Sequence, residues 1–239
     1  METLKPNRQR AKNAITLIWI VLALEIISLI SGYFQYDLLQ VAANGGEIST
    51  ETVTENDTRE QIIAIVYLIA FIISAIAFIY WFRRAYFNLH LRVNHLSQTE
   101  GWAAGSWFVP IVCLYMPYQI MRELYQETKE LLEKKELSTN ESLTTSSLGL
   151  WWTQWIINNI IGQFVYRYSM KAESIDELTI STVASMIGNV VGIPLALITI
   201  KVINDYSNVE PRLIEIMSEE EETTIAQQRS GALGVLSEL

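Results

Sequence analysis

Long blocks of apolar residues alternate with polar stretches along this chain. Four blocks are long enough to cross a bilayer as helices, at residues 14–34, 61–82, 148–168 and 178–200. A helix rises about 1.5 Å per residue, so about 20 apolar residues span a hydrocarbon core of about 30 Å. The pattern therefore predicts an all-α polytopic membrane protein with four transmembrane helices.

A fifth apolar stretch, residues 101–121, differs from these four blocks. It contains Gly101, Gly105, Pro110 and Pro117, which an ordinary spanning helix does not need. Each proline removes a backbone donor and disfavours helix at the residue before it. Irregular backbone is tolerated at membrane depth only where protein buries it or where it lines a watery cavity. We predict a Trp- and Pro-rich re-entrant or interfacial segment that returns to the side it came from.

The distribution of Lys and Arg supports this topology. If residues 101–121 do not cross, 14 of the 17 basic residues lie on the amino-terminal side, whereas a fifth crossing would divide them 9 to 8. Cytoplasmic loops carry the excess of Lys and Arg. We therefore expect a multi-pass protein of the inner membrane with both termini in the cytoplasm. Residues 1–205 are predicted to form one membrane domain, and residues 206–239 an acidic, disordered tail.

An amphipathic pattern follows the re-entrant segment. Over residues 119–137, apolar residues such as Leu124 and Leu131 recur at near-helical spacing among charged ones. This pattern predicts a cytoplasmic surface helix. We expect its apolar side, together with the re-entrant segment, to contact a protein partner or lipids.

Composition and motifs argue against several classes of function. Half of the residues are hydrophobic and the formal net charge is -9, which does not favour nucleic-acid binding. The single cysteine, Cys113, excludes an intrachain disulfide and a cysteine-based zinc cluster. His90 and His95 are five residues apart, a poor spacing for one helical face, so we predict neither a metal nor a cofactor. Because no nucleophile, metalloprotease or phosphate-binding motif is present, a non-enzymatic function is favoured.

Polar residues inside the apolar blocks form the candidate intramembrane site. Glu25 lies in the middle of the first block, where an ionisable residue is costly and often functional. The later blocks contain Asn158, Asn159, Gln163 and Asn189. If these side chains face one cavity, they would line the polar path of a small channel or transporter. Alternatively, they hydrogen-bond between helices and only stabilise packing.

Several short motifs together resemble a known family. WFRRAYFNL at 81–89 is followed by GWA at 101–103, GSWFVP at 105–110, PYQ at 117–119 and REL at 122–124, and a tryptophan pair opens a later block. This combination resembles the signature of a largely bacterial family of membrane proteins, catalogued as domain of unknown function family 4328. The resemblance implies the following signature residues: Arg83, Arg84, Asn88, Gly101, Trp102, Gly105, Trp107, Phe108, Pro110, Pro117, Tyr118, Gln119, Arg122, Glu123, Trp151 and Trp152. The family has no established activity, so the resemblance implies architecture and leaves function open.

Two further roles are expected for charged residues near this signature. Arg83, Arg84 and Arg92 follow the second block and are placed to bind anionic lipid headgroups or simply to anchor the topology. Arg122 or Glu123 is expected to anchor the backbone of the re-entrant segment. The expected partners are thus the lipid bilayer, anionic headgroups, and a protein partner or a second copy of the chain.

Overall fold

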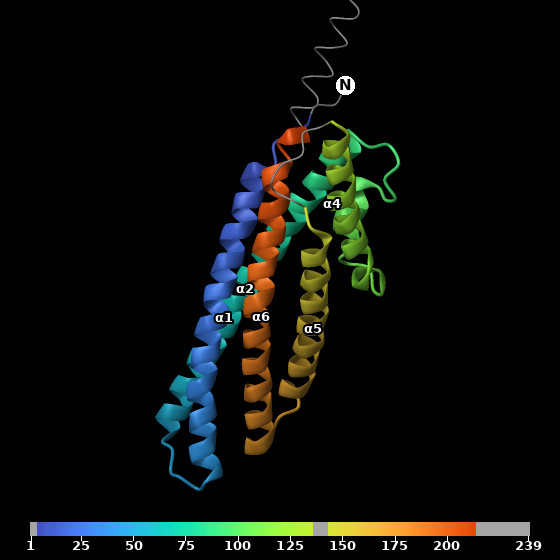
Figure 1. Cartoon of the computed structure of the whole chain (residues 1–239). Coiled ribbons are helices and arrows are strands. Elements are labelled where there is room, and N and C mark those ends of the chain that lie inside the picture. Colours follow the sequence, from blue (N-terminus) through green and yellow to red (C-terminus); the bar gives the residue numbers. More distant parts are fainter. Residues whose placement is uncertain (1–3, 136–142, 214–239) are drawn as a thin grey trace, which may run out of the picture.

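The computed structural model describes residues 4–135 and 143–213, and these residues are all-α (Figure 1). They form six α helices: α1 (Arg8–Ala43), α2 (Thr50–His90), α3 (Glu100–Gly105), α4 (Met116–Lys134), α5 (Thr145–Ser169) and α6 (Ile175–Val209). A single 3-10 turn, η1 (Val112–Leu114), precedes α4.

Four long helices run along a common axis. α1 packs against both α2 and α6, and α5 packs on α6 (Figure 1). α1 and α5 run in one direction, and α2 and α6 run in the other. We call the end where α1 begins and α6 ends the upper end, as drawn in Figure 1, and the opposite end the lower end.

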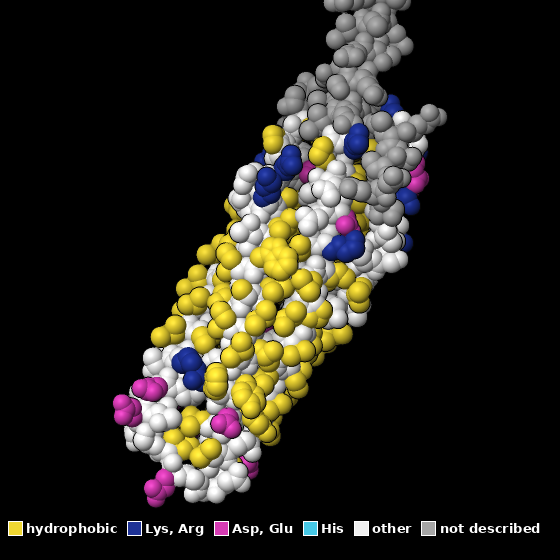
Figure 2. All heavy atoms as spheres, turned by 60° about the vertical axis from the view of Figure 1, so that its left-hand side comes forward, with side chains coloured by type: hydrophobic (Ala, Val, Ile, Leu, Met, Phe, Trp, Pro, Cys, Tyr) yellow, Lys and Arg dark blue, Asp and Glu magenta, His cyan; other side chains and the backbone are white. Residues whose placement is uncertain are grey.

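Three of the described helices, α1, α2 and α6, are long and apolar enough to cross a membrane. Their middle parts expose large apolar side chains, such as Ile65, Leu68 and Ile72 of α2, each about half exposed. Figure 2 shows a broad hydrophobic band over the middle of one face of the molecule, with most charged groups gathered toward the two ends. Such a surface is unfavourable in water and suited to lipid. These helices therefore support a multi-pass membrane protein.

Helix α5, which coincides with the expected third span, is not among these three. Its apolar residues are interrupted by four amides, at Gln154, Asn158, Asn159 and Gln163. The helix itself covers the whole predicted range, 148–168, and extends slightly beyond it at both ends.

The helices extend well beyond the predicted apolar blocks. Most of residues 36–60, between the first two apolar blocks, are helical, because only residues 44–49 connect α1 to α2. Gly45 turns the chain with φ of 76°, and the Ser49 side chain caps α2 by accepting the Thr52 N–H at 3.1 Å. Hydropathy marks the apolar part of a helix, and a polar extension into water leaves no comparable signal.

The densest core lies at the upper end. Phe82 of α2, Tyr206 of α6 and Leu124 of α4 are all fully buried there. The apolar side of α4 thus packs inside the chain's own core. This corrects the expectation that Leu124 would face a partner.

The ordered fold continues past residue 205, because Tyr206, Val209 and Leu213 are buried. The remainder of the expected tail, residues 214–239, and the last residues of the expected amphipathic helix, 136–137, lie outside the described residues.

Candidate functional site

The chain between α2 and α4 leaves the upper end of the bundle, turns, and returns to it (Figure 1). α3 ends at Gly105, and Pro117 lies in the first turn of α4. Proline is well suited to that position, because the first N–H groups of a helix have no intrahelical partner. The two glycines and two prolines therefore fall in or beside a short irregular connection. We call residues 106–115 the tip segment.

Trp107 ties the tip segment to the bundle. Its ring lies edge-on to aromatic rings of α2 and α5, with centroid distances between 5.7 and 6.5 Å to Phe78, Phe82, Trp151, Trp152 and Trp155. Each such pair contributes roughly 0.5–1.5 kcal/mol beyond the area it buries. We call these six residues the aromatic cluster.

Hydrogen bonds reinforce the aromatic cluster. Trp152 Nε1 donates to the Leu114 carbonyl at 3.1 Å, and its ring stacks on Trp155 at 4.6 Å. Trp151 Nε1 donates to Thr199 Oγ1 of α6 at 3.0 Å. The tryptophan pair that opens α5 thus connects the tip segment on one side with α6 on the other.

The tip segment displays large apolar side chains on its outer surface. Phe108 and Ile111 are each 75% exposed. Ile111 also has φ of 68°, a conformation that is unusual for a β-branched residue and costs on the order of 1–3 kcal/mol. A strained backbone of this kind persists only where its surroundings fix it. Here the aromatic cluster supplies that support.

Glu123 of α4 anchors the chain just before α3. Its carboxylate accepts the Ser97 N–H at 2.7 Å and the Tyr86 hydroxyl at 2.5 Å. The neighbouring Arg122 is exposed. Glu123 therefore binds backbone at Ser97, just before the segment 101–121, and not within the segment that it was expected to anchor.

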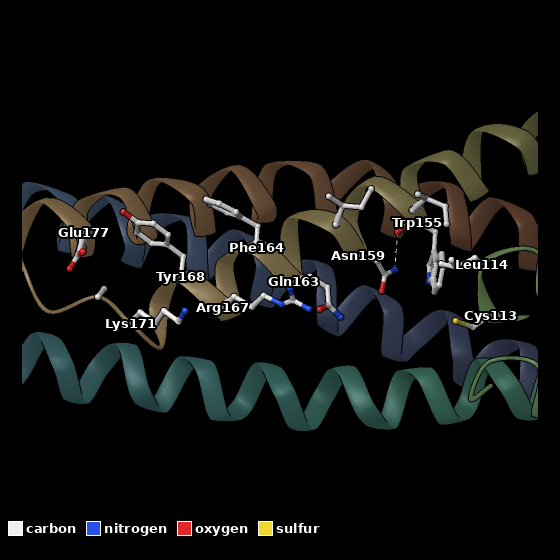
Figure 3. A pocket seen from close by; sticks show the side chains of 13 residues that line it. Cys113, Leu114, Trp155, Asn159, Gln163, Phe164, Arg167, Tyr168, Lys171 and Glu177 are labelled. Atoms are coloured by element: carbon white, nitrogen blue, oxygen red, sulfur yellow. Dashed lines mark hydrogen bonds between the residues drawn. The ribbon is translucent and has the colours of Figure 1, made fainter. Parts of the chain in front are cut away.

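A groove of about 970 Å³ runs along α5 (Figure 3). Its chemistry changes along the helix. Leu114 of the tip segment and Trp155 line one end, Asn159 and Gln163 lie in the middle, and Arg167 and Lys171 lie at the lower end. Two of the predicted intramembrane amides thus share one groove.

Glu25 lies elsewhere, between three helices. It is 5% exposed, and the Tyr67 hydroxyl of α2 donates to its Oε1 at 2.7 Å. Gly192 of α6 packs directly on the carboxylate, since a Cβ at that position would lie 2.5 Å from Oε1. Asn158 and Asn189 are partly buried, and neither they nor Glu25 lines the groove along α5. The predicted polar set is therefore distributed over more than one place.

A buried polar cluster at the upper end joins the two ends of the described chain. The Glu210 carboxylate accepts the Asn88 amide at 2.7 Å and the Asn7 amide at 3.1 and 3.2 Å. Asn88 also exchanges two hydrogen bonds, both 3.0 Å, with the backbone of Lys5. Burial raises the pKa of Glu210 to about 7, although the two amides and Arg84 act in the opposite direction.

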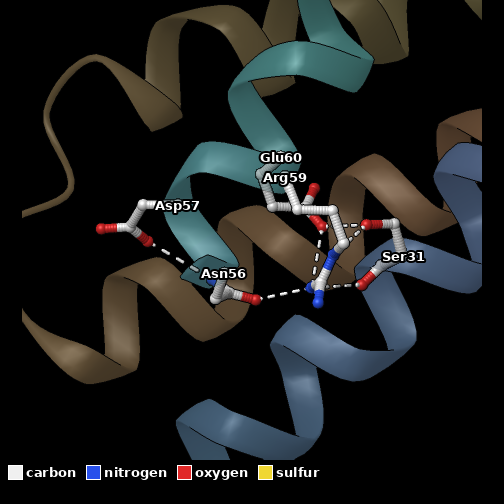
Figure 4. Close-up of polar contacts among 5 residues, drawn as sticks. All are labelled: Ser31, Asn56, Asp57, Arg59 and Glu60. Atoms are coloured by element: carbon white, nitrogen blue, oxygen red, sulfur yellow. Dashed lines mark hydrogen bonds and ion pairs between the residues drawn. The ribbon is translucent and has the colours of Figure 1, made fainter. Parts of the chain in front are cut away.

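A second polar cluster lies at the lower end (Figure 4). Arg59 Nε donates to Ser31 Oγ at 2.8 Å, and Arg59 Nη2 donates to Asn56 Oδ1 at 2.6 Å. Ser31 also bonds to Glu60, which lies 3.4 Å from Arg59. This cluster links α1 to α2 near their connection.

The other signature residues have mainly structural surroundings. Arg83 forms an ion pair with Glu100 at 3.0 Å, Arg84 lies over the Phe87 ring, and Tyr118 stacks on Trp152. Trp102 and Gln119 are exposed. No group of three or more His, Cys, Asp or Glu side chains in the described ranges is arranged to hold a metal ion.

Sequence reasoning did not identify several partners of these residues. Tyr67 and Gly192, which contact Glu25, lie in apolar blocks where a tyrosine or a glycine is ordinary. Asn7 and Glu210 are separated by almost the whole chain, so no local pattern relates them. For Arg167 and Lys171 the sequence does offer a signal, because these two basic residues lie four positions apart at the end of an apolar block.

Comparison with known proteins adds the family. The model of a family described as Domain of unknown function (DUF4328) matches residues 44–208. The chain belongs to this family. The matched region runs from the start of the α1–α2 connection almost to the end of α6, so it includes the aromatic cluster, the tip segment and the groove. Glu25, Asn7 and Glu210 lie outside it. No curated protein and no solved structure matches the chain.

Proposed function

We propose that α1, α2, α5 and α6 all cross the inner membrane, with the upper end and both termini in the cytoplasm. The four helices run along one axis, and most of the Lys and Arg residues belong to the upper end. On this placement α5 is a fourth span that tolerates its amides because it packs on α6 and borders a groove. The tip segment then enters the cytoplasmic side of the bilayer and returns without crossing.

On this topology the protein acts as a non-enzymatic membrane module that interacts with lipids or a protein partner through the tip segment. The observation that carries the proposal is the outward display of Phe108 and Ile111 on a strained backbone held by Trp107. Exposed aromatic and aliphatic side chains on a fixed scaffold suit the boundary between headgroups and acyl chains. α4 directly follows the tip segment in the chain, and its apolar side packs in the internal core.

Cys113 offers a direct test of tip immersion, because it is the only cysteine and lies in η1. We expect a fluorophore on Cys113 in nanodiscs to be quenched by spin-labelled lipids and protected from aqueous iodide. A matched control places the label at Gln126, on the exposed side of α4, in a Cys113→Ser background. At Gln126 we expect aqueous iodide to quench the fluorophore and spin-labelled lipids to have little effect. Efficient iodide quenching at Cys113 would contradict the proposal.

A photoreactive amino acid at Phe108 tests what the tip contacts. In cell membranes we expect covalent adducts with lipid or with one discrete protein, and no such adducts from the same group at Gln126. Equal adduct patterns at the two positions would count against the tip as an interaction site.

The helix topology has its own test. With Cys113 replaced by Ser, a cysteine at Ser97 or Gln126 should react with a membrane-impermeant reagent from the cytoplasmic side. A cysteine at Ser174, between α5 and α6, should react from the other side. Reaction of Ser174→Cys from the cytoplasm would remove α5 as a span.

A small channel or transporter is the second candidate function. It is favoured by the burial of Glu25 beside the Tyr67 hydroxyl, because an intramembrane carboxylate is typical of proton and ion paths. We expect any proton or cation flux in proteoliposomes to fall with Glu25→Gln and to persist with Glu60→Gln. Identical flux in wild-type and empty vesicles would eliminate this candidate.

A further inference from the structure

The groove along α5 has two cations at its lower end without a carboxylate partner. Arg167 and Lys171 both line it and project into it (Figure 3). Within the described ranges neither side chain forms an ion pair or a hydrogen bond. Arg59, the other basic residue of the lower end, is already held by Ser31 and Asn56. Lys171 lies two residues beyond the end of α5, so the two cations border the groove where the chain turns from α5 toward α6.

The one carboxylate that lines the groove is already engaged. Glu177 accepts the backbone N–H groups of Glu173 at 2.9 Å and Ser174 at 3.2 Å, and together with Ser174 it forms the capping box of α6. These hydrogen bonds direct the Glu177 carboxylate to the start of α6. The anion that would complement Arg167 and Lys171 is therefore not supplied by this side chain.

The remaining groups follow an order along the groove. Gln163 lies one helical turn above Arg167, about 6 Å along the axis, and its amide has no hydrogen-bond partner within the described residues. Ile160 and Ile156 continue the groove toward Trp155. From Arg167 to Ile156 the helix rises about 16 Å, close to half of a hydrocarbon core of about 30 Å. The groove thus presents cations, then an amide, then one leaflet's length of apolar surface.

We propose that this groove binds an anionic glycerophospholipid of the extracytoplasmic leaflet. The phosphate lies between Arg167 and Lys171, the ester carbonyls face the Gln163 amide, and an acyl chain follows Ile160 and Ile156 toward Trp155. A phosphate complements the charge of the two cations, and an ester carbonyl can accept a hydrogen bond from the Gln163 amide, which lipid tails cannot. The inference rests on the proposed crossing of the bilayer by α5, and it names a lipid class whose headgroup site, at Arg167 and Lys171, lies at the other end of the groove from the tip segment.

Native mass spectrometry of the full chain in detergent can measure this binding with phosphatidylglycerol and phosphatidylcholine of the same acyl chains. We expect the wild-type protein to retain phosphatidylglycerol with a preference on the order of tenfold. Arg167→Gln with Lys171→Gln should abolish the preference. Gln163→Leu should weaken retention of both lipids while the preference persists.

The matched control removes two cations elsewhere. Lys129→Gln with Lys134→Gln lowers the charge of the exposed side of α4 equally and should leave the preference intact. If the double variant at Arg167 and Lys171 does not fold, Lys171→Gln alone, beyond the end of α5, should still reduce the preference severalfold. A wild-type protein without preference, or a preference that survives Arg167→Gln with Lys171→Gln, would overturn the proposal.

A competing occupant is a second copy of the chain, with its α5 seated in the groove. Gln163→Cys in a Cys113→Ser background would then form a disulfide-linked dimer in membranes, and this outcome would also overturn the proposal. Labelling of Ser174→Cys from the cytoplasm would instead show that α5 does not cross, which is a failure of the proposed topology. The two kinds of failure are therefore distinguishable.

Discussion

Two phenylalanines of the same helix show how differently the two regions of this molecule are stabilised. Phe82 of α2 lies at the upper end and is fully buried, whereas Phe71, three turns earlier, is 48% exposed. Around Phe82 the helices carry a second layer, formed by α4 and the tip segment. Around Phe71 the surface is open to the surrounding medium.

This difference shows that the two regions are adapted to different solvents. At the upper end, water drives apolar side chains such as Phe82, Leu124 and Tyr206 into a protein core. In the middle, lipid tails are as apolar as the side chains, so exposure there has little cost and association depends on packing and hydrogen bonds. The boundary between the two regions is where the tip segment turns.

The largest expected effect is on the free energy of unfolding when each of these two phenylalanines is replaced by alanine. Phe82→Ala should lower the free energy of unfolding by roughly 3–5 kcal/mol, because it leaves a cavity in a packed core. Phe71→Ala should cost less than about 1 kcal/mol, since lipid can fill the space. Unfolding by SDS in mixed micelles, followed by tryptophan fluorescence, measures both. Similar losses for the two variants would show that both regions share one kind of core.

The polar clusters at the two ends differ in the same way. The upper cluster encloses Glu210, which is 7% exposed and is bonded by two amides. The lower cluster contains Arg59, whose side chain remains 40% exposed (Figure 4). A hydrogen bond in the upper cluster should therefore contribute more to the free energy of unfolding than one in the lower cluster, because water cannot replace it there.

Glu210 gives the next largest effect, as a dependence of stability on pH. Burial raises its pKa from 4.5 to about 7, so between these values the folded state binds more protons than the unfolded state. Glu210 thus contributes at most about 3 kcal/mol to the free energy of unfolding. This contribution is complete below pH 4.5 and is lost as the pH rises through about 7. We expect chemical unfolding in micelles at pH 5 and pH 8 to show this fall, and Glu210→Gln to reduce it. An unchanged pH dependence in Glu210→Gln would exclude Glu210 as its source.

Much of the architecture could be predicted from the sequence, because apolar blocks report directly on helices that avoid water. The helical blocks were predictable in this way, the glycines and prolines from Gly105 to Pro117 indicated the irregular tip, and the family followed from the resemblance of the short motifs. The helix ends were not predictable, since α1 continues through the mixed sequence from Gln35 to Ala43 and α2 begins in the polar sequence from Thr50 to Glu60.

The surroundings of the candidate residues could not be predicted from the sequence. Periodicity placed an apolar side on α4, but it cannot say whether that side packs on the same chain or on a partner. Likewise, Glu25 was recognised as unusual, but its contacts with Tyr67 and Gly192 depend on the rotation of three helices. These contacts are set by tertiary packing, and one sequence carries no local signal for them.

The smallest expected effect concerns Arg59 in the lower cluster. Arg59→Gln should lower the free energy of unfolding by roughly 0.5–1.5 kcal/mol, because it removes hydrogen bonds that connect α2 to Ser31 of α1. Arg83→Gln is the matched control, since it breaks an exposed ion pair with Glu100 at 3.0 Å, and such pairs contribute about 0–1 kcal/mol. The same micelle assay can compare them, with Ser31→Ala as a second route to the Arg59 interaction. If Ser31→Ala and Arg59→Gln were fully additive, the two side chains would not act together, and the lower cluster would be only a set of solvated groups.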